Sequence, residues 1–265
     1  MSKTFIIAEA ACTWLHGGLE AAYRSIRAAK ECGADAFKTQ WTSNARSMAQ
    51  ARWSRMQLEA RFQTVDQMAE KYQRLAWPEV WLPLLKAECD KVGIEFMCTA
   101  FLVGDFEILN RFTKRTKVSA FESKDKEFTW GVIDIDPAKD MVISSNLDHH
   151  SWRGGAIKSL YCVSEYPTTL ERLGLHHLAD FLMGTDDKPH RKYDGLSDHT
   201  TSTLTGAVAV GAGARIIEKH VRLSDTPSTD PDYGHSLQMD GTALFVTHRT
   251  FKQYVDNIRE AERML

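Results

Sequence analysis

Short apolar runs alternate with amphipathic segments along this chain, and the alternation restricts it to folds in which helices cover a parallel β-sheet. The predicted strands are residues 4–9, 35–40, 95–99, 116–120, 141–145, 157–163, 193–197 and 215–219. The predicted helices are residues 19–31, 78–91, 102–112, 170–183, 201–211 and 241–265. The segments after the fourth and fifth strands look short or irregular. Eight such units in 265 residues match a (β/α)8 TIM barrel, with a doubly wound open sheet as the alternative.

An insertion at about residues 44–76 interrupts this alternation of strands and helices. No linker or repeat divides the chain, so residues 1–265 are expected to form one domain. The apolar residues of the insertion have helical spacing: Met56, Leu58, Phe62, Val65, Met68 and Tyr72. Packing onto the barrel or a neighbouring subunit is the favoured interpretation. A roof over the active face is the alternative, because the insertion follows the carboxyl end of a strand.

Charge and cysteine content narrow the class of protein. The formal net charge of −2, with acids and bases interspersed, provides no basic stripe, so nucleic acid is not an expected partner. The five cysteines are scattered, mostly in apolar runs, as is typical of reduced thiols in a cytoplasmic protein. No apolar run approaches membrane-spanning length and the first residues do not resemble a signal peptide, so we expect a soluble protein without a membrane partner.

The segment 195–220, GLSDHTTSTLTGAVAVGAGARIIEKH, predicts two strands joined by a helix, each strand ending in polar residues. The carboxyl ends of parallel strands meet at one edge of a sheet, so SDH at 197–199 should lie beside EKH at 218–220. A single histidine at a strand end is more often just a hydrogen-bonded surface residue. Two on neighbouring strands favour a shared divalent metal, with His199 and His220 as its ligands.

Lysines inside two predicted strands are candidates for binding an anion. Lys38 lies within AFKTQ and Lys117 within TKVSA. Either lysine alone faces outward with its ammonium group in solvent or, inside a barrel, serves a buried anion. Together with hydroxyl groups from other strand ends, they describe a pocket for phosphate or carboxylate. A desolvated lysine can also attack a carbonyl carbon, so a Schiff-base role stays open.

The turn TDPDYGH after the last predicted strand brings further polar groups toward the mouth of the barrel. Asp232 is a candidate site residue there, while His235 is ambiguous between a site residue and a surface residue. The chain contains no glycine-rich phosphate loop, CxxC, HExxH or GxSxG motif, which argues against the common nucleotide-binding, zinc-ribbon, zincin and hydrolase classes.

Nine short motifs carry a resemblance that spans nearly the whole chain. They are IIAEA, GADAFKTQ, GIEFMCTAF, KVSAFE, VISSNL, YCVSEYPTT, DGLSDHT, GARIIEKH and TDPDYGHSL. In this order and at about this spacing they resemble the sialic acid synthase family, whose members condense phosphoenolpyruvate with an aldehyde sugar such as N-acetylmannosamine. The resemblance implies a (β/α)8 catalytic barrel that forms a nonulosonic acid, a 2-keto acid, and releases phosphate.

The resemblance also implies roles for individual residues. His199 and His220 match the ligands of a divalent metal, usually Mn²⁺, with Mg²⁺ or Co²⁺ as alternatives. The positions that match residues binding phosphoenolpyruvate are Lys38, Gln40, Thr99, Lys117, Ser144, Ser164 and Ser197. The positions that match residues near the sugar or the reacting carbons are Glu9, Glu122, Tyr166 and Asp232. Glu122 or Glu9 is the expected carboxylate for activating water or moving protons.

Several positions depart from the family pattern. KVSAFE stands where the family commonly has KI(A/G)SGE, so Ala120 replaces a phosphate-binding serine and Phe121 replaces a glycine. Ser164 stands where an asparagine is usual, and CTWLHGG replaces INHNG in the first loop. The sequence ends at Leu265, whereas family members continue into a small antifreeze-like domain that reaches over a partner's active site.

These departures make the acceptor sugar the least defined part of the expected function. The family implies a homodimer, and a separate capping subunit is an alternative source of the missing cover. Two other functions stay open: a lysine Schiff-base aldolase on the same barrel, and a non-catalytic accessory or binding member of the family.

Overall fold

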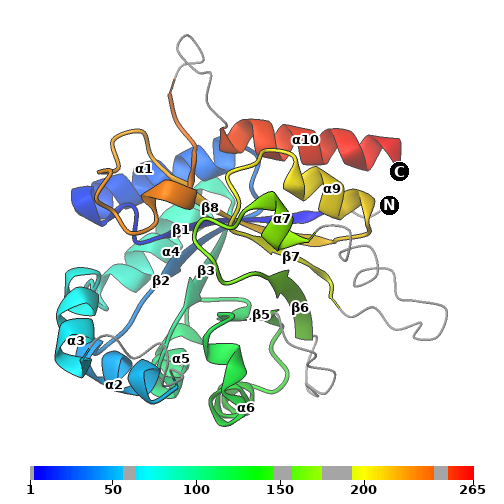
Figure 1. Ribbon diagram of the computed structural model, residues 1–265. Helices are drawn as coiled ribbons and strands as arrows, with labels where there is room; N and C mark the ends of the chain where they lie inside the picture. The colour runs from blue at the N-terminus through cyan, green and yellow to red at the C-terminus, as the bar shows by residue number, and fades with distance from the viewer. Residues whose placement is uncertain (1–2, 56–63, 146–156, 175–192, 242–249) are drawn as a thin grey trace, which may run out of the picture.

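The computed structural model describes residues 3–55, 64–145, 157–174, 193–241 and 250–265. Eight parallel strands follow one another around a closed barrel, in which β1 pairs with β8 (Figure 1). The barrel strands are β1 (Phe5–Ala11), β2 (Ala36–Gln40), β3 (Glu95–Thr99), β4 (Thr116–Val118), β5 (Met141–Ser145), β6 (Ile157–Cys162), β7 (Gly195–Asp198) and β8 (Ile216–Arg222). The predicted (β/α)8 barrel is confirmed, and the open sheet is excluded.

Helices surround the barrel on its outer side (Figure 1). They are α1 (Gly18–Glu31), α4 (Trp81–Val92), α5 (Val103–Leu109), α6 (Lys126–Ile135), α7 (Leu170–Leu173), α9 (Thr205–Gly211) and α10 (Phe251–Met264). The insertion supplies α2 (Ala45–Arg55) and α3 (Val65–Arg74), and short 3-10 turns form η1 (Leu15–Gly17), η3 (Glu122–Lys124) and η4 (Tyr233–His235). A short strand, β9 (Leu237–Gln238), pairs with β8. Among these helices, none is both long and apolar enough to cross a membrane.

Parts of the predicted helices lie outside the described residues. These parts are residues 175–183 and 242–249, and in the insertion Met56, Leu58 and Phe62.

The expectation of a short or irregular segment after the fourth strand is wrong, because α6 follows it. Gly131 and the β-branched residues around it lower the intrinsic helix propensity of this segment. The side chain of Asp125 compensates by accepting a hydrogen bond from the Phe128 backbone N–H (3.0 Å), which caps the first turn. Phe128, Val132 and Ile133 are buried, so tertiary packing stabilises the helix further.

The barrel interior changes character along its axis. Five buried apolar side chains fill the lower interior: Ile7, Ala36, Met97, Val142 and Leu160. A larger apolar core lies between the strands and the surrounding helices. Buried charged and hydroxyl side chains near the carboxyl ends of the strands replace the apolar ones in the upper interior. Successive residues of a strand face opposite sides of the barrel wall. Polar residues of one strand that both face the upper interior are therefore separated by two positions in the sequence.

All five cysteines are free and buried, as the sequence predicts for reduced thiols. In the loop CTWLHGG, Trp14 is buried against Trp77, with ring centroids 5.5 Å apart. The Trp77 indole in turn donates a hydrogen bond to the Gln40 carbonyl oxygen (2.8 Å). This replacement of the family's first loop therefore helps to hold the end of β2 at the barrel mouth.

Candidate active site

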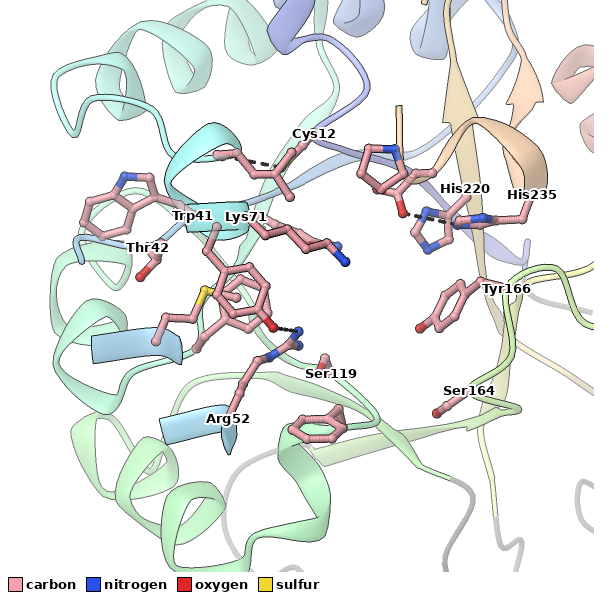
Figure 2. A pocket seen from close by; sticks show the side chains of 18 residues that line it. Cys12, Trp41, Thr42, Arg52, Lys71, Ser119, Ser164, Tyr166, His220 and His235 are labelled. Carbon is pink, nitrogen blue, oxygen red and sulfur yellow. Dashed lines mark hydrogen bonds and ion pairs between the residues drawn. The ribbon is translucent and has the colours of Figure 1, made fainter. Parts of the chain in front are cut away.

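A cavity of about 430 Å³ lies at the carboxyl ends of the strands. Five of the residues that the sequence singles out line it: Gln40, Ser164, Tyr166, His220 and Asp232. Figure 2 shows Tyr166, His220 and His235 grouped on one wall, with Arg52 and Lys71 on the other. The barrel mouth is thus the place where the predicted groups gather.

The insertion forms one wall of this cavity. Arg52 on α2 and Lys71 and Tyr72 on α3 are among its lining residues. The insertion therefore lines the cavity, as the alternative of a roof over the active face predicts, while Met68 is buried, as the packing interpretation predicts. Packing onto a neighbouring subunit stays a prediction. Helical spacing alone could not decide between the two interpretations, because the same spacing serves a packing face and a cavity wall.

Two lysine and two glutamate side chains form a buried cluster beside the cavity. The Lys38 ammonium lies 2.5 Å from a Glu9 carboxylate oxygen and 3.8 Å from Glu218, and Lys117 lies 3.5 Å from Glu218. Each is at most 5% exposed. Gln40 donates a hydrogen bond to Glu9 (3.0 Å) and so connects the cluster to the cavity lining. Two positive and two negative charges balance, as buried charges must.

Hydroxyl groups complete this cluster. Lys38 donates to the Thr99 hydroxyl (3.2 Å), Lys117 donates to Ser144 (2.9 Å), and Ser197 donates to Glu218 (3.1 Å). The structure thus brings together five of the residues predicted to bind phosphoenolpyruvate: Lys38, Lys117 and Ser197 contact carboxylates, and Thr99 and Ser144 contact the lysines. None of the five belongs to the cavity lining found among the described residues.

The pKa values of the four charged groups are shifted in different directions. Burial raises the pKa of Glu9, whereas Lys117 and Lys38 overcome the effect of burial and lower the pKa of Glu218. Burial lowers the pKa of Lys117, while Glu218 and Glu9 outweigh burial and raise that of Lys38. The sequence places Glu218 in the EKH segment beside SDH at 197–199 but does not assign it a role in the site. Glu218 stands two residues before His220, so strand alternation already placed both side chains on the same face.

Glu122 has a different setting from the one expected of a carboxylate that activates water. Its side chain is fully buried, does not line the cavity, and accepts hydrogen bonds from Arg52 Nε (2.7 Å) and Nη2 (3.1 Å). The Arg52 guanidinium also lies 4.6 Å from the Phe101 ring centroid and 5.1 Å from that of Phe121. The residue at the family's glycine position therefore supports Arg52, which the sequence did not single out.

The residues of the SDH and EKH segments do not all face the same side of the barrel wall, because successive residues of a strand point in opposite directions. Ser197, His199, Glu218 and His220 belong to the site. Asp198 and Lys219 instead form a fully buried ion pair (3.0 Å), and the Tyr254 hydroxyl on α10 donates to Asp198 (2.9 Å). This pair joins the barrel to its last helix and lies outside the candidate site.

The two predicted metal ligands lie close together, with His199 and His220 ring centroids 5.3 Å apart. His199 Nδ1–H donates to the Val163 carbonyl oxygen (2.8 Å), which leaves the Nε2 lone pair available. His220 Nδ1 is buried and makes no hydrogen bond with any described residue. The Tyr166 ring lies 4.2 Å from that of His199.

A third histidine and a carboxylate lie against this pair. One ligand atom from each of His220, Asp232 and His235 falls within 4.8 Å of the others. Burial lowers the pKa of His199 to about 4 and that of His220 well below its usual value, so both imidazoles are neutral at pH 7 and offer lone pairs. Neutral imidazoles with a carboxylate are a donor set that suits a divalent transition metal. The residues present therefore fit such an ion.

The pKa of His199 predicts how stability depends on pH. Between its usual value of 6.5 and about 4, the unfolded chain binds a proton at this residue while the folded chain does not. The free energy of unfolding should therefore fall as the pH drops through this window, by up to about 3 kcal/mol from this residue. His199→Gln should lose correspondingly less stability. Urea unfolding in chelator from pH 7 to pH 4 tests this, and parallel curves for the two proteins would contradict it.

The fold and site define a (β/α)8-barrel enzyme whose polar groups gather at the carboxyl ends of the strands. The sequence model of the NeuB family matches residues 25–265, and the chain belongs to this family. The resemblance to sialic acid synthases is thereby confirmed.

Similarity to individual proteins agrees with this. The chain is 28% identical to the pseudaminic acid synthase of Campylobacter jejuni, over 99% of this chain and 75% of that protein. It is 27% identical to the N,N'-diacetyllegionaminic acid synthase of Legionella pneumophila, over 98% of this chain and 73% of the relative. A crystal structure of a sialic acid synthetase from Leptospira borgpetersenii shares the fold with a TM-score of 0.75 and 20% identity, covering 99% of this chain and 85% of that one. The chain is an enzyme of the sialic acid synthase type.

Proposed function

We propose that the protein condenses phosphoenolpyruvate with the open-chain form of an aldose, giving a 2-keto acid of the nonulosonic type and inorganic phosphate. The observation that carries the proposal is the arrangement at one barrel mouth of two neutral histidines, His199 and His220, beside a buried cluster of two lysines and two carboxylates. Membership in the NeuB family supports the same reaction.

The lysine cluster suits the anionic substrate. Lys38 and Lys117, with the hydroxyls of Thr99 and Ser144, can replace part of the hydration shell of a phosphate or carboxylate group. Glu218 supplies the counter-charge when no substrate is bound. The ammonium groups are thereby held in position before substrate enters, which limits reorganisation during the reaction.

The bond changes balance with water as the second co-substrate. C3 of phosphoenolpyruvate forms a bond to the aldehyde carbon, and the aldehyde oxygen takes up a proton and becomes a hydroxyl. Water adds at C2 and gives up one proton, and the C2–O bond to phosphate then breaks as the new C2 hydroxyl loses its proton to form the ketone, so that of the two water protons one ends on the former aldehyde oxygen and one on phosphate. Glu9 is the carboxylate we assign to take a proton from that water, because burial raises its pKa and Gln40 connects it to the cavity. A divalent metal held by His220 and its neighbours would polarise the aldehyde oxygen.

The cavity wall suggests the class of acceptor. Tyr72, Phe101 and Phe121 give an aromatic surface on which a sugar ring or an acetamido group can pack, and Arg52 and Lys71 offer hydrogen-bond donors. An N-acetylmannosamine-like aldose fits this chemistry. Phe121, where the family commonly has glycine, reduces the space on this side.

A screen of aldoses tests the proposal. Purified protein is incubated with phosphoenolpyruvate, a divalent metal and one aldose at a time, and the products are analysed by mass spectrometry. We expect at least one aldose to gain the mass of one pyruvic acid molecule, with one phosphate released per product. Omitting the aldose should stop phosphate release, and so should adding a chelator. Failure of every acceptor in the presence of Mn²⁺ would favour the non-catalytic accessory function.

Lys117 supports a second candidate, a Schiff-base aldolase. Burial lowers its pKa, which is a property of lysines that attack carbonyl groups. Borohydride reduction in the presence of a keto acid would attach the substrate covalently to Lys117 or Lys38 if this function holds. An unlabelled protein that still forms product would exclude it.

A further inference from the structure

The turn that follows β8 places His235 against the histidines of the barrel. His235 ends the 3-10 turn η4 and is only 2% exposed, although it belongs to a loop. Its ring centroid lies 4.5 Å from that of His220 and 6.3 Å from that of His199. Figure 2 shows His235 and His220 side by side on the same wall of the cavity.

We infer that His235 is a metal ligand, and that it completes a three-residue site with His220 and Asp232. The inference rests on the proposed function, because it defines which ion the site of that reaction selects. It can be tested separately, since binding of the ion can be measured without turnover.

Two buried nitrogen atoms that make no hydrogen bond within the described part of the chain carry the inference. His235 Nε2 and His220 Nδ1 are buried, and neither makes a hydrogen bond with any described residue. Leaving a buried polar atom without a hydrogen bond is unfavourable, so two such atoms in one cluster indicate that a ligand binds there. A metal ion would satisfy both imidazoles, because each would donate a lone pair to it.

The spacing of the ligand atoms agrees. His235 Nε2 lies 3.4 Å from Asp232 Oδ1, which is too long for a good hydrogen bond. Two ligands that each lie about 2.0–2.2 Å from one ion are separated by roughly 3–3.5 Å in tetrahedral or octahedral geometry. The contact between this histidine and this carboxylate therefore has the separation of two ligands of a shared ion.

The surrounding chain holds the ligand turn in place. The Asp232 backbone N–H donates to the Asp230 side chain (2.9 Å), and the Ser236 hydroxyl donates to the Asp232 carbonyl oxygen (2.6 Å). Residues on both sides of His235 are thus fixed to the same turn. A ligand position that is fixed before the metal arrives reduces the entropy cost of binding.

An additional imidazole changes which ion the site prefers. Nitrogen ligands suit zinc, cobalt and iron, whereas magnesium and manganese favour oxygen ligands. Two imidazoles and one carboxylate, with His199 close by, should therefore bind Co²⁺ or Zn²⁺ more tightly than Mn²⁺, and Mg²⁺ most weakly.

The test is a set of metal titrations on the full chain. Calorimetry measures the affinity, and visible absorption reports the surroundings of bound Co²⁺. For His235→Phe, which keeps a ring but has no lone pair, we expect Co²⁺ affinity to fall by at least about 10-fold and the spectrum of bound Co²⁺ to change. For His235→Cys, we expect tight Co²⁺ binding to persist with a sulfur-to-cobalt charge-transfer band that the wild type lacks.

Tyr233→Phe is the matched control, because it lies in the same turn and keeps the ring that packs against Arg222. It should bind Co²⁺ like the wild type, and thermal unfolding in chelator should show that every variant is folded. Unchanged Co²⁺ affinity and spectrum in His235→Phe would overturn the inference, and so would a His235→Cys protein without the new band. A wild type that binds Co²⁺ through His235 but forms no product would instead contradict only the proposed function.

Discussion

Replacing His220 with alanine is expected to lower phosphate release from phosphoenolpyruvate by at least about 1000-fold, which corresponds to about 4 kcal/mol of transition-state stabilisation. His220 lines the cavity and is shared by both sets of ligands, the predicted pair with His199 and the trio with Asp232 and His235. Whichever neighbours hold the ion, its removal should therefore leave the aldehyde without polarisation.

The measurement is the initial rate of phosphate release with a productive aldose from the screen, at saturating divalent metal. His16→Ala is the matched control, because His16 lies in the first loop, bonds to the Thr13 carbonyl oxygen and is not among the described residues that line the cavity. It should keep the wild-type rate. A His220→Ala enzyme that retains more than about a tenth of the wild-type rate would argue that the imidazole is not part of the chemistry.

The barrel could be predicted because strand patterns are local. Each of the eight predicted strands overlaps an observed one, since most of them contain the short apolar run that is typical of buried parallel strands. The helix α6 was missed because its residues have weak helix propensity, and its stability comes from the Asp125 cap and from packing. Patterns within one element therefore predicted the architecture, while helix boundaries depended on contacts outside the element.

The site was predictable only in part. Lysines and histidines at strand ends stand out from their apolar surroundings, and the structure does bring Lys38, Lys117, His199 and His220 to one end of the barrel. Arg52 and His235 could not be assigned in the same way, because they belong to an insertion and a turn whose positions are determined by tertiary contacts. The Arg52 partner Glu122 is 70 residues away in the sequence. An ordinary helical arginine carries no signal for such contacts, and the position of His235 in a turn near the barrel mouth leaves it ambiguous between a site residue and a surface residue.

Replacing Glu218 with alanine is expected to lower the free energy of unfolding by about 3–5 kcal/mol at pH 7, the usual cost of removing one member of a buried ion cluster. The loss would leave Lys38 and Lys117 facing only Glu9, and the remaining excess positive charge has no access to water. Urea unfolding in phosphate-free buffer measures the change. Glu70→Ala, which removes an exposed ion pair with Arg74, should cost less than about 1 kcal/mol.

The pH dependence of the stability difference between the wild type and Glu218→Ala shows whether Glu218 stabilises the fold through its charge or through packing. The pKa of Glu218 is lower in the folded protein than its usual value of 4.5, so its contribution to stability is present above about pH 4.5 and is lost as the pH falls through the folded-state pKa. The gap between wild type and Glu218→Ala should therefore narrow in acid. The double variant Lys117→Met with Glu218→Leu should recover part of the lost stability, since it removes a positive charge together with its partner. A gap that stays constant with pH, or a double variant less stable than Glu218→Ala, would mean that Glu218 acts through packing and does not serve as the counter-ion of the two lysines.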